Sequence, residues 1–161
     1  EVTSSITGVG LFVFVVYALA AVAQLIIGSL IDRHALGRIF LVIAVMQIPA
    51  FVLTGVVGGF ATLFAAIPMM FVVFGLIPIN EVMVARYSSP EYRTRIYSVR
   101  YTLTFAAVAA AIPTVAWFHT AYGDFGEMFV TLGAMSVVLT LAAAGLVLVE
   151  RHNAAARPVW A

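Results

Sequence analysis

The chain has 161 residues, of which 64% are hydrophobic and only 9% are charged. A soluble domain is nearer a quarter charged, so there is too little polar side chain here to cover a surface that faces water, and the surrounding solvent must largely be lipid. The net charge of +1 gives no basis for binding nucleic acid, and the absence of cysteine excludes disulfides and thiol chemistry.

Long uncharged runs follow one another along the chain, at 2–31, 39–80, 101–123 and 128–149. A bilayer core about 30 Å thick needs roughly 20 apolar residues in a helix. The second run is about twice that length, and the glycines of GVVGGF favour a turn in its middle. Runs this long favour helices over the short alternating strands of a β-barrel. The sequence therefore predicts an all-α membrane protein with five transmembrane helices, at 7–31, 38–57, 61–84, 90–119 and 126–149, and a tail at 150–161.

The fourth predicted helix has a recognisable beginning. Ser89 stands at the N-cap position, Pro90 at the first helical position and Glu91 just inside the helix. This combination is typical of helix N-termini, and the charge of Glu91 suits the positive end of the helix dipole. We therefore expect this helix to begin at Pro90.

The basic residues give the predicted orientation in the membrane. All of them are arginines, and with five spans every one falls on the side that holds the first link, the third link and the tail. Basic residues collect on the cytoplasmic side, so we predict that these links and the C-terminus are cytoplasmic. The arginines are Arg33, Arg38, Arg86, Arg93, Arg95, Arg100, Arg151 and Arg157.

The predicted topology has an odd number of spans and an external start. The chain also begins with Glu1 rather than Met, and we interpret it as part of a longer protein. A lysine-free chain rich in Arg, Ala and Val is typical of a GC-rich bacterial genome, which would place the protein in an inner membrane.

The link between the first two predicted helices concentrates charge and glycine. Gly28, Asp32, Arg33, Gly37 and Arg38 stand in the segment GSLIDRHALGR. This pattern resembles the loop motif of the major facilitator superfamily, Gly-x-x-x-Asp-Arg/Lys-x-Gly-Arg/Lys-Arg/Lys, which recurs between the second and third helices of that family and, more weakly, between the eighth and ninth. Here three residues rather than one separate Arg33 from Gly37, and only one base follows that glycine.

The position of this motif in the chain extends the resemblance. One predicted helix precedes it and four follow, as in helices eight to twelve of the family's C-terminal half. The segment SSPEYRTRIYS is similar to the family's link between the tenth and eleventh helices. The resemblance implies a twelve-helix transporter in which residues 1–161 are a partial C-terminal transmembrane domain, completed by the missing N-terminal half of the same protein.

The resemblance also implies a role for the motif. In the family such contacts hold the cytoplasmic side closed while the site is open outward, and Asp32 would contact the fifth helix. Gly28 would let a neighbouring helix approach closely, and Asp32 can pair with Arg33 or Arg38 or face the N-terminus of another helix. The alternative is that the three charged residues only set topology.

Glu81 lies about one turn before the third predicted helix leaves the hydrocarbon, where a carboxylate is costly. Its natural partner is Arg100, at a similar depth in the next, antiparallel helix. The structural alternatives are a stabilising interhelical ion pair or a Glu81 carboxylate that reaches water at the membrane surface. The functional alternatives are a gate pair or a protonatable coupling group.

Further polar side chains in the spans are candidates for contact with a solute. Tyr17 and Gln24 share one helix face, and Tyr97, Arg100, Tyr101 and Thr104 form a stripe on the fourth helix. By resemblance, the eighth, tenth and eleventh helices line the central cavity. The candidates are therefore Tyr17, Gln24, Asn80, Tyr101 and Thr104, and for each the alternative is an ordinary interhelical hydrogen bond.

The leading interpretation is that the chain is part of a secondary active transporter that moves a small solute by alternating access. Proton coupling through Glu81 and passive transport remain open alternatives. A non-transporting membrane scaffold or complex subunit is the second interpretation. No paired catalytic groups, metal-ligand cluster or phosphate-binding loop is found in the sequence, so we expect neither an enzyme nor a cofactor. The expected partners are the solute, the lipid bilayer and the other half of the protein.

Overall fold

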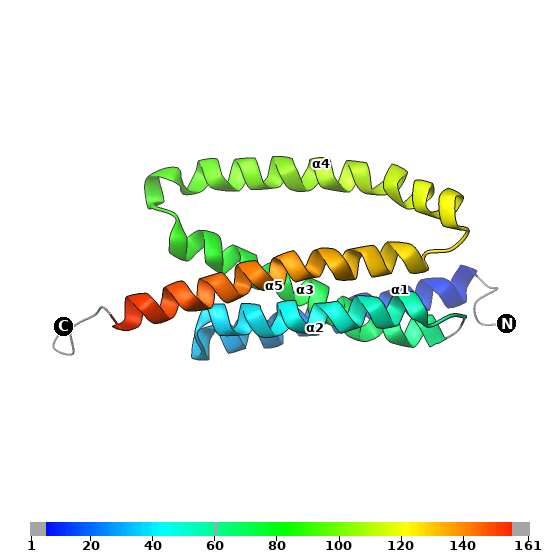
Figure 1. Ribbon diagram of the computed structural model, residues 1–161, viewed down its shortest axis with the longest axis horizontal. Helices are drawn as coiled ribbons and strands as arrows, with labels where there is room; N and C mark the ends of the chain where they lie inside the picture. The colour runs from blue at the N-terminus through cyan, green and yellow to red at the C-terminus, as the bar shows by residue number, and fades with distance from the viewer. Residues whose placement is uncertain (1–5, 60, 156–161) are drawn as a thin grey trace.

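The computed structural model describes residues 6–59 and 61–155, which fold into five α-helices. All five are long and apolar enough to cross a membrane, which confirms the predicted fold class. Successive helices run antiparallel along the long axis of the molecule (Figure 1). They are α1 (Ile6–Arg33), α2 (Leu36–Val56), α3 (Ala61–Tyr87), α4 (Pro90–Tyr122) and α5 (Gly126–Ala155).

The links and helix ends agree with the turn and capping residues in the sequence, with two corrections. Gly59 adopts a left-handed φ of 63° in the predicted glycine turn, and Gly123, at φ 79°, ends α4. Ser89 occupies the N-cap of α4, but its hydroxyl makes no cap bond. The predicted tail is wrong for residues 150–155, because no Gly or Pro interrupts the chain there and α5 continues to Ala155. The rest of that tail, with Arg157, lies outside the described residues, as does Glu1.

The core lies among α1, α2, α3 and α5. α2 packs against α5 and α3, and α3 packs against α1. Leu36 at the start of α2 and Ile79 on α3 are completely buried. Lipid is as apolar as these side chains, so close van der Waals packing, rather than escape from water, stabilises the helix contacts.

Glycines allow the closest helix approaches. A Cβ atom on Gly126 of α5 would lie 2.9 Å from the carbonyl oxygen of Gly55 on α2, and the converse distance is also 2.9 Å. On α3, a Cβ atom on Gly75 would lie 3.2 Å from Ile27 of α1. No other described helix makes the close approach expected at Gly28, since none of them has a heavy atom within 4 Å of its Cβ position. α1 therefore meets α3 one residue earlier, at Ile27.

α4 stands apart from the other helices along most of its length (Figure 1). It contacts α3 and α5 only sparsely, and it has no buried residue. Short links at Ser88–Ser89 and at 123–125 hold its two ends. The helix that carries Arg100 is therefore the one with the least packing to restrain it.

Candidate functional site

The described arginines lie at or toward one end of the bundle. This end holds the C-termini of α1, α3 and α5 and the N-termini of α2 and α4 (Figure 1). The opposite end holds the glycine link and the link that contains Asp124. Charge is thus segregated along the bundle axis. We refer to the end with the arginines as the arginine end.

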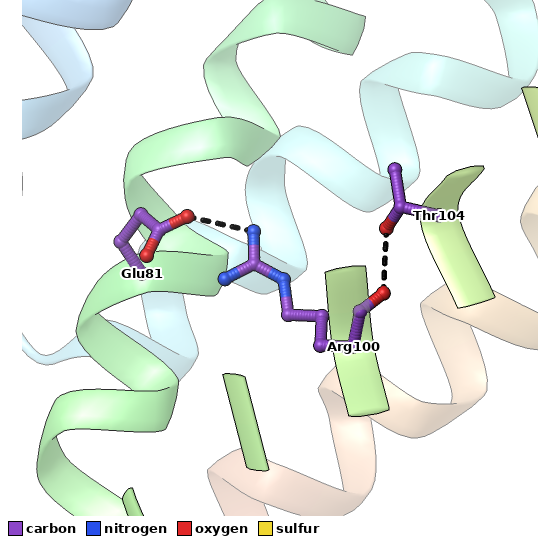
Figure 2. A network of polar contacts seen from close by, with 3 residues as sticks. All are labelled: Glu81, Arg100 and Thr104. Atoms are coloured by element: carbon purple, nitrogen blue, oxygen red, sulfur yellow. Dashed lines mark hydrogen bonds and ion pairs between the residues drawn. The ribbon is translucent and has the colours of Figure 1, made fainter. Parts of the chain in front are cut away.

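Glu81 and Arg100 form an ion pair between α3 and α4 (Figure 2). Arg100 Nη2 lies 2.7 Å from Glu81 Oε1, and the side chains are 28% and 39% exposed, in that order. The two residues meet because α3 and α4 are antiparallel and a two-residue link joins them. At this distance the contact is a charge-assisted hydrogen bond.

Two tyrosine rings surround the guanidinium of Arg100. Its Cζ atom lies 6.0 Å from the ring centroid of Tyr97 and 5.6 Å from that of Tyr101. The two rings are stacked, with centroids 6.2 Å apart. These cation–π contacts favour one orientation of the guanidinium. Its second terminal nitrogen, Nη1, is buried and has no acceptor in the part of the chain that the structure describes.

The other cavity candidates fall into two groups. Tyr101 and Thr104 lie beside the ion pair on α4, where Thr104 Oγ1 donates to the Arg100 carbonyl at 2.9 Å (Figure 2). Tyr17 lies on α1 and packs edge-to-face on Phe74 of α3, with centroids 5.6 Å apart. Gln24 is half-buried on α1, and Asn80 is exposed beside Glu81 in sequence. The structure thus brings only the α4 candidates into contact with Arg100.

A groove runs along α4 next to the ion pair. It is an open face of this one helix, with a volume of about 640 Å³. Arg100 and Thr104 contribute polar groups to it, and most of the remaining wall is aliphatic. Its lining residues are Tyr92, Arg95, Ile96, Val99, Arg100, Leu103, Thr104 and Ala107.

The charged residues of the loop motif are exposed. Asp32, Arg33 and Arg38 all face solvent, and among the described residues Asp32 makes no ion pair with either arginine. Exposed pairs gain little because water already solvates both charges. The pairings considered for Asp32 within this chain are therefore not formed here.

Gly37 is the motif residue with a defined long-range contact. Its backbone N–H faces Glu150 of α5, with the nitrogen 3.1 Å from Oε2 and 3.3 Å from Oε1. Tyr87, at the end of α3, donates its hydroxyl to Oε1 at 3.0 Å. The first amides of a helix have no partner within the helix, and a negative charge is favourable there. One carboxylate therefore joins α2, α3 and α5 at the arginine end, and we call Gly37, Tyr87 and Glu150 the carboxylate clasp.

A side chain at residue 37 would disturb the clasp. A Cβ atom there would lie 2.6 Å from Glu150 Oε2, so the carboxylate would have to turn away from the amide. Sequence reasoning missed Glu150 because it assigned this residue to a tail. The sequence did contain a signal for this contact. Glu150 directly follows the last apolar run, and it falls on the same predicted side of the membrane as the amides that begin the second helix.

Comparison with protein families gives one match. Residues 1–160 match the family model described as Major Facilitator Superfamily, whereas comparison with curated proteins and with solved structures gives no match. The family match covers almost the whole chain and agrees with the five membrane-length helices. This integral membrane protein belongs to the major facilitator superfamily, a family of transporters.

Proposed function

We propose that the chain is part of the C-terminal half of a secondary active transporter that moves a small solute by alternating access. In this proposal α1 to α5 correspond to helices eight to twelve, and an N-terminal half of the same protein forms the facing wall. The arginine end would be cytoplasmic, following the positive-inside rule, in a bacterial inner membrane. Membership of a transporter family supports the proposal, and the observation that carries it is the Glu81–Arg100 ion pair.

The ion pair is placed where it can control the position of α4. Ionisable groups within membrane spans are costly and typically mark solute or proton pathways. α4 has few other contacts with the bundle, so its position relative to α3 depends strongly on the bond between Arg100 and Glu81. Breaking this bond would free α4 to move, and forming it would restrain the helix.

Protonation of Glu81 supplies a way to break the bond. A neutral carboxyl group forms a weaker hydrogen bond with a guanidinium than a carboxylate does. Binding of a proton would therefore loosen α4, and its release would restore the restraint. This links proton binding to the movement of a helix that we place in the cavity wall.

The remaining candidate residues would act together with the Glu81–Arg100 ion pair. Tyr101 and Thr104 would contact a solute beside the ion pair, and Tyr17, Gln24 and Asn80 would do so elsewhere on the cavity wall. The carboxylate clasp would keep α2, α3 and α5 together as a unit against which α4 moves. Asp32 would act through a helix of the N-terminal half.

The test is solute-driven proton flux by the full-length protein in proteoliposomes that contain a pH-sensitive dye. Sugars, amino acids and organic anions are added separately. We expect at least one class to acidify or alkalinise the lumen, and Glu81→Gln to abolish that change. Arg86→Gln is the control, because it also removes charge near the end of α3 but lies outside the ion pair. Folded protein that moves no solute would contradict the proposal and favour a membrane scaffold.

A further inference from the structure

The groove on α4 is mostly apolar, and two arginines stand among the residues at one of its ends. Arg95 and Arg100 line it toward the arginine end, and Ile96, Val99 and Leu103 expose 40%, 61% and 65% of their surface. From Arg100 the groove continues seven residues to Ala107, which is about 10 Å at 1.5 Å per residue. A molecule lying there would meet positive charge first and then hydrocarbon.

Glu81 holds the Arg100 donor that matters here. Nη2 binds the Glu81 carboxylate, whereas Nη1 is buried and has no acceptor among the described residues, so an anion in the groove would have to take Nη2 from Glu81. A guanidinium offers five N–H donors in a planar fork that matches the oxygens of a carboxylate or sulfonate. Arg95 lies over the ring of Tyr92, with Cζ 6.0 Å from its centroid, and makes no ion pair with any described residue. The positive charge at this end of the groove is therefore only partly neutralised.

We propose that the solute is an amphipathic organic anion whose carboxylate or sulfonate binds Arg100 and whose apolar body lies along α4. This inference rests on the proposed transport function and specifies the class of solute. Charge complementarity selects the anion, and the length of the aliphatic wall sets an apolar body of about 10 Å.

The anion and Glu81 compete for the same guanidinium. When the anion takes Arg100, the Glu81 carboxylate loses its cation and is left as an isolated charge within a membrane span, which is costly. Glu81 then takes up one proton from water. The Tyr97 hydroxyl of α4 also faces this carboxylate, but it is neutral and cannot replace the lost charge. One anion and one proton are thus bound together, with no net change in charge.

The test measures binding to the purified full-length protein by equilibrium dialysis, with protein-free micelles as the blank. The probes are 2-naphthalenesulfonate and 2-naphthyltrimethylammonium, which share a ring system and carry permanent charges of opposite sign. We expect the sulfonate to bind at least tenfold more tightly than the ammonium compound. Arg100→Gln should weaken sulfonate binding tenfold or more, since it removes a charged hydrogen-bond donor.

Removing the Glu81 carboxylate, which competes with the sulfonate for Arg100, should have the opposite effect on sulfonate binding. Glu81→Gln should tighten sulfonate binding, because it releases Arg100, whereas Arg86→Gln, our control, should leave binding unchanged. The double variant Glu81→Gln with Arg100→Gln leaves no unpaired charge, so it tests the loss of binding if Arg100→Gln alone fails to fold.

Two results would overturn the inference. One is equal affinity for the two probes, which would indicate that a helix of the longer protein or lipid covers the groove. The other is weaker binding in Glu81→Gln. If either occurs while another solute still drives proton flux, the organic-anion assignment fails and the transport function stands. If the folded protein moves no solute at all, the transport function itself fails.

Discussion

Glu150 on α5 accepts a hydrogen bond from the backbone amide of Gly37 on α2, across 113 positions of the chain, with its two carboxylate oxygens 3.1 and 3.3 Å from the nitrogen. Tyr87 donates to the same carboxylate from α3. A single acidic side chain thus meets three helix ends, which makes the arginine end of the bundle sensitive to small changes at any of the three residues.

Gly37→Ala should destabilise the protein by about 1–3 kcal/mol, the cost of disrupting hydrogen bonds to a part-buried charged group. The added Cβ atom would lie 2.6 Å from Glu150 Oε2, so the carboxylate must move away from the amide. Unfolding in detergent measures the effect. Gly145→Ala is the control, because Gly145 is also helical but no other described helix has a heavy atom within 4 Å of its Cβ position. Equal stability of the two variants would contradict the clasp.

Tyr87→Phe should cost about 1 kcal/mol in the native background, the net value of one hydrogen bond. In a Glu150→Ala background the same change should cost almost nothing, because its acceptor is already gone. A double-mutant cycle on unfolding free energies isolates this coupling. Additive effects of the two substitutions would show that the hydroxyl and the carboxylate do not interact.

Gly126→Ala should also destabilise the protein, by about 1–3 kcal/mol, the range typical of overpacking. The obstacle here is the backbone carbonyl of Gly55, 2.9 Å from the new Cβ atom, and a backbone cannot turn aside as a side chain can. α5 must therefore shift away from α2. Thermal unfolding in detergent should show a lower midpoint than for Gly145→Ala, and an unchanged midpoint would mean that α2 and α5 are not packed this closely.

Cysteine labelling tests the orientation, and the chain contributes no native cysteine to the background. Single cysteines at His34 and Glu91 should react with a membrane-impermeant maleimide only from the cytoplasmic side. Cysteines at Gly58 and Tyr122 should react only from the opposite side. Labelling of the first two positions from different sides would contradict the five-span topology.

The spans and the ion pair could be predicted from sequence because both depend on short-range information. Run lengths determine how many helices cross the membrane. The short link between α3 and α4 brings Glu81 and Arg100 to similar depth without knowledge of any other contact. The structure places them 2.7 Å apart.

The packing of α2 against α5 could not be predicted in this way. These helices are far apart in sequence, and they are apolar on all sides, so no amphipathic stripe marks the face that is buried. The close contact of Gly55 with Gly126 depends on that packing, and it was missed for the same reason. The isolation of α4 likewise leaves no signature in its own residues.

The exposure of α4 has a consequence for how the protein is made. α4 is the least apolar of the five candidate spans, it carries Arg93, Arg95 and Arg100, and none of the other four described helices buries it. During synthesis α3 leaves the ribosome first, so Glu81 is already present when Arg100 reaches the insertion machinery. A neutralising partner lowers the cost of moving a charge into lipid. We therefore expect Glu81 to help the next segment to enter the bilayer.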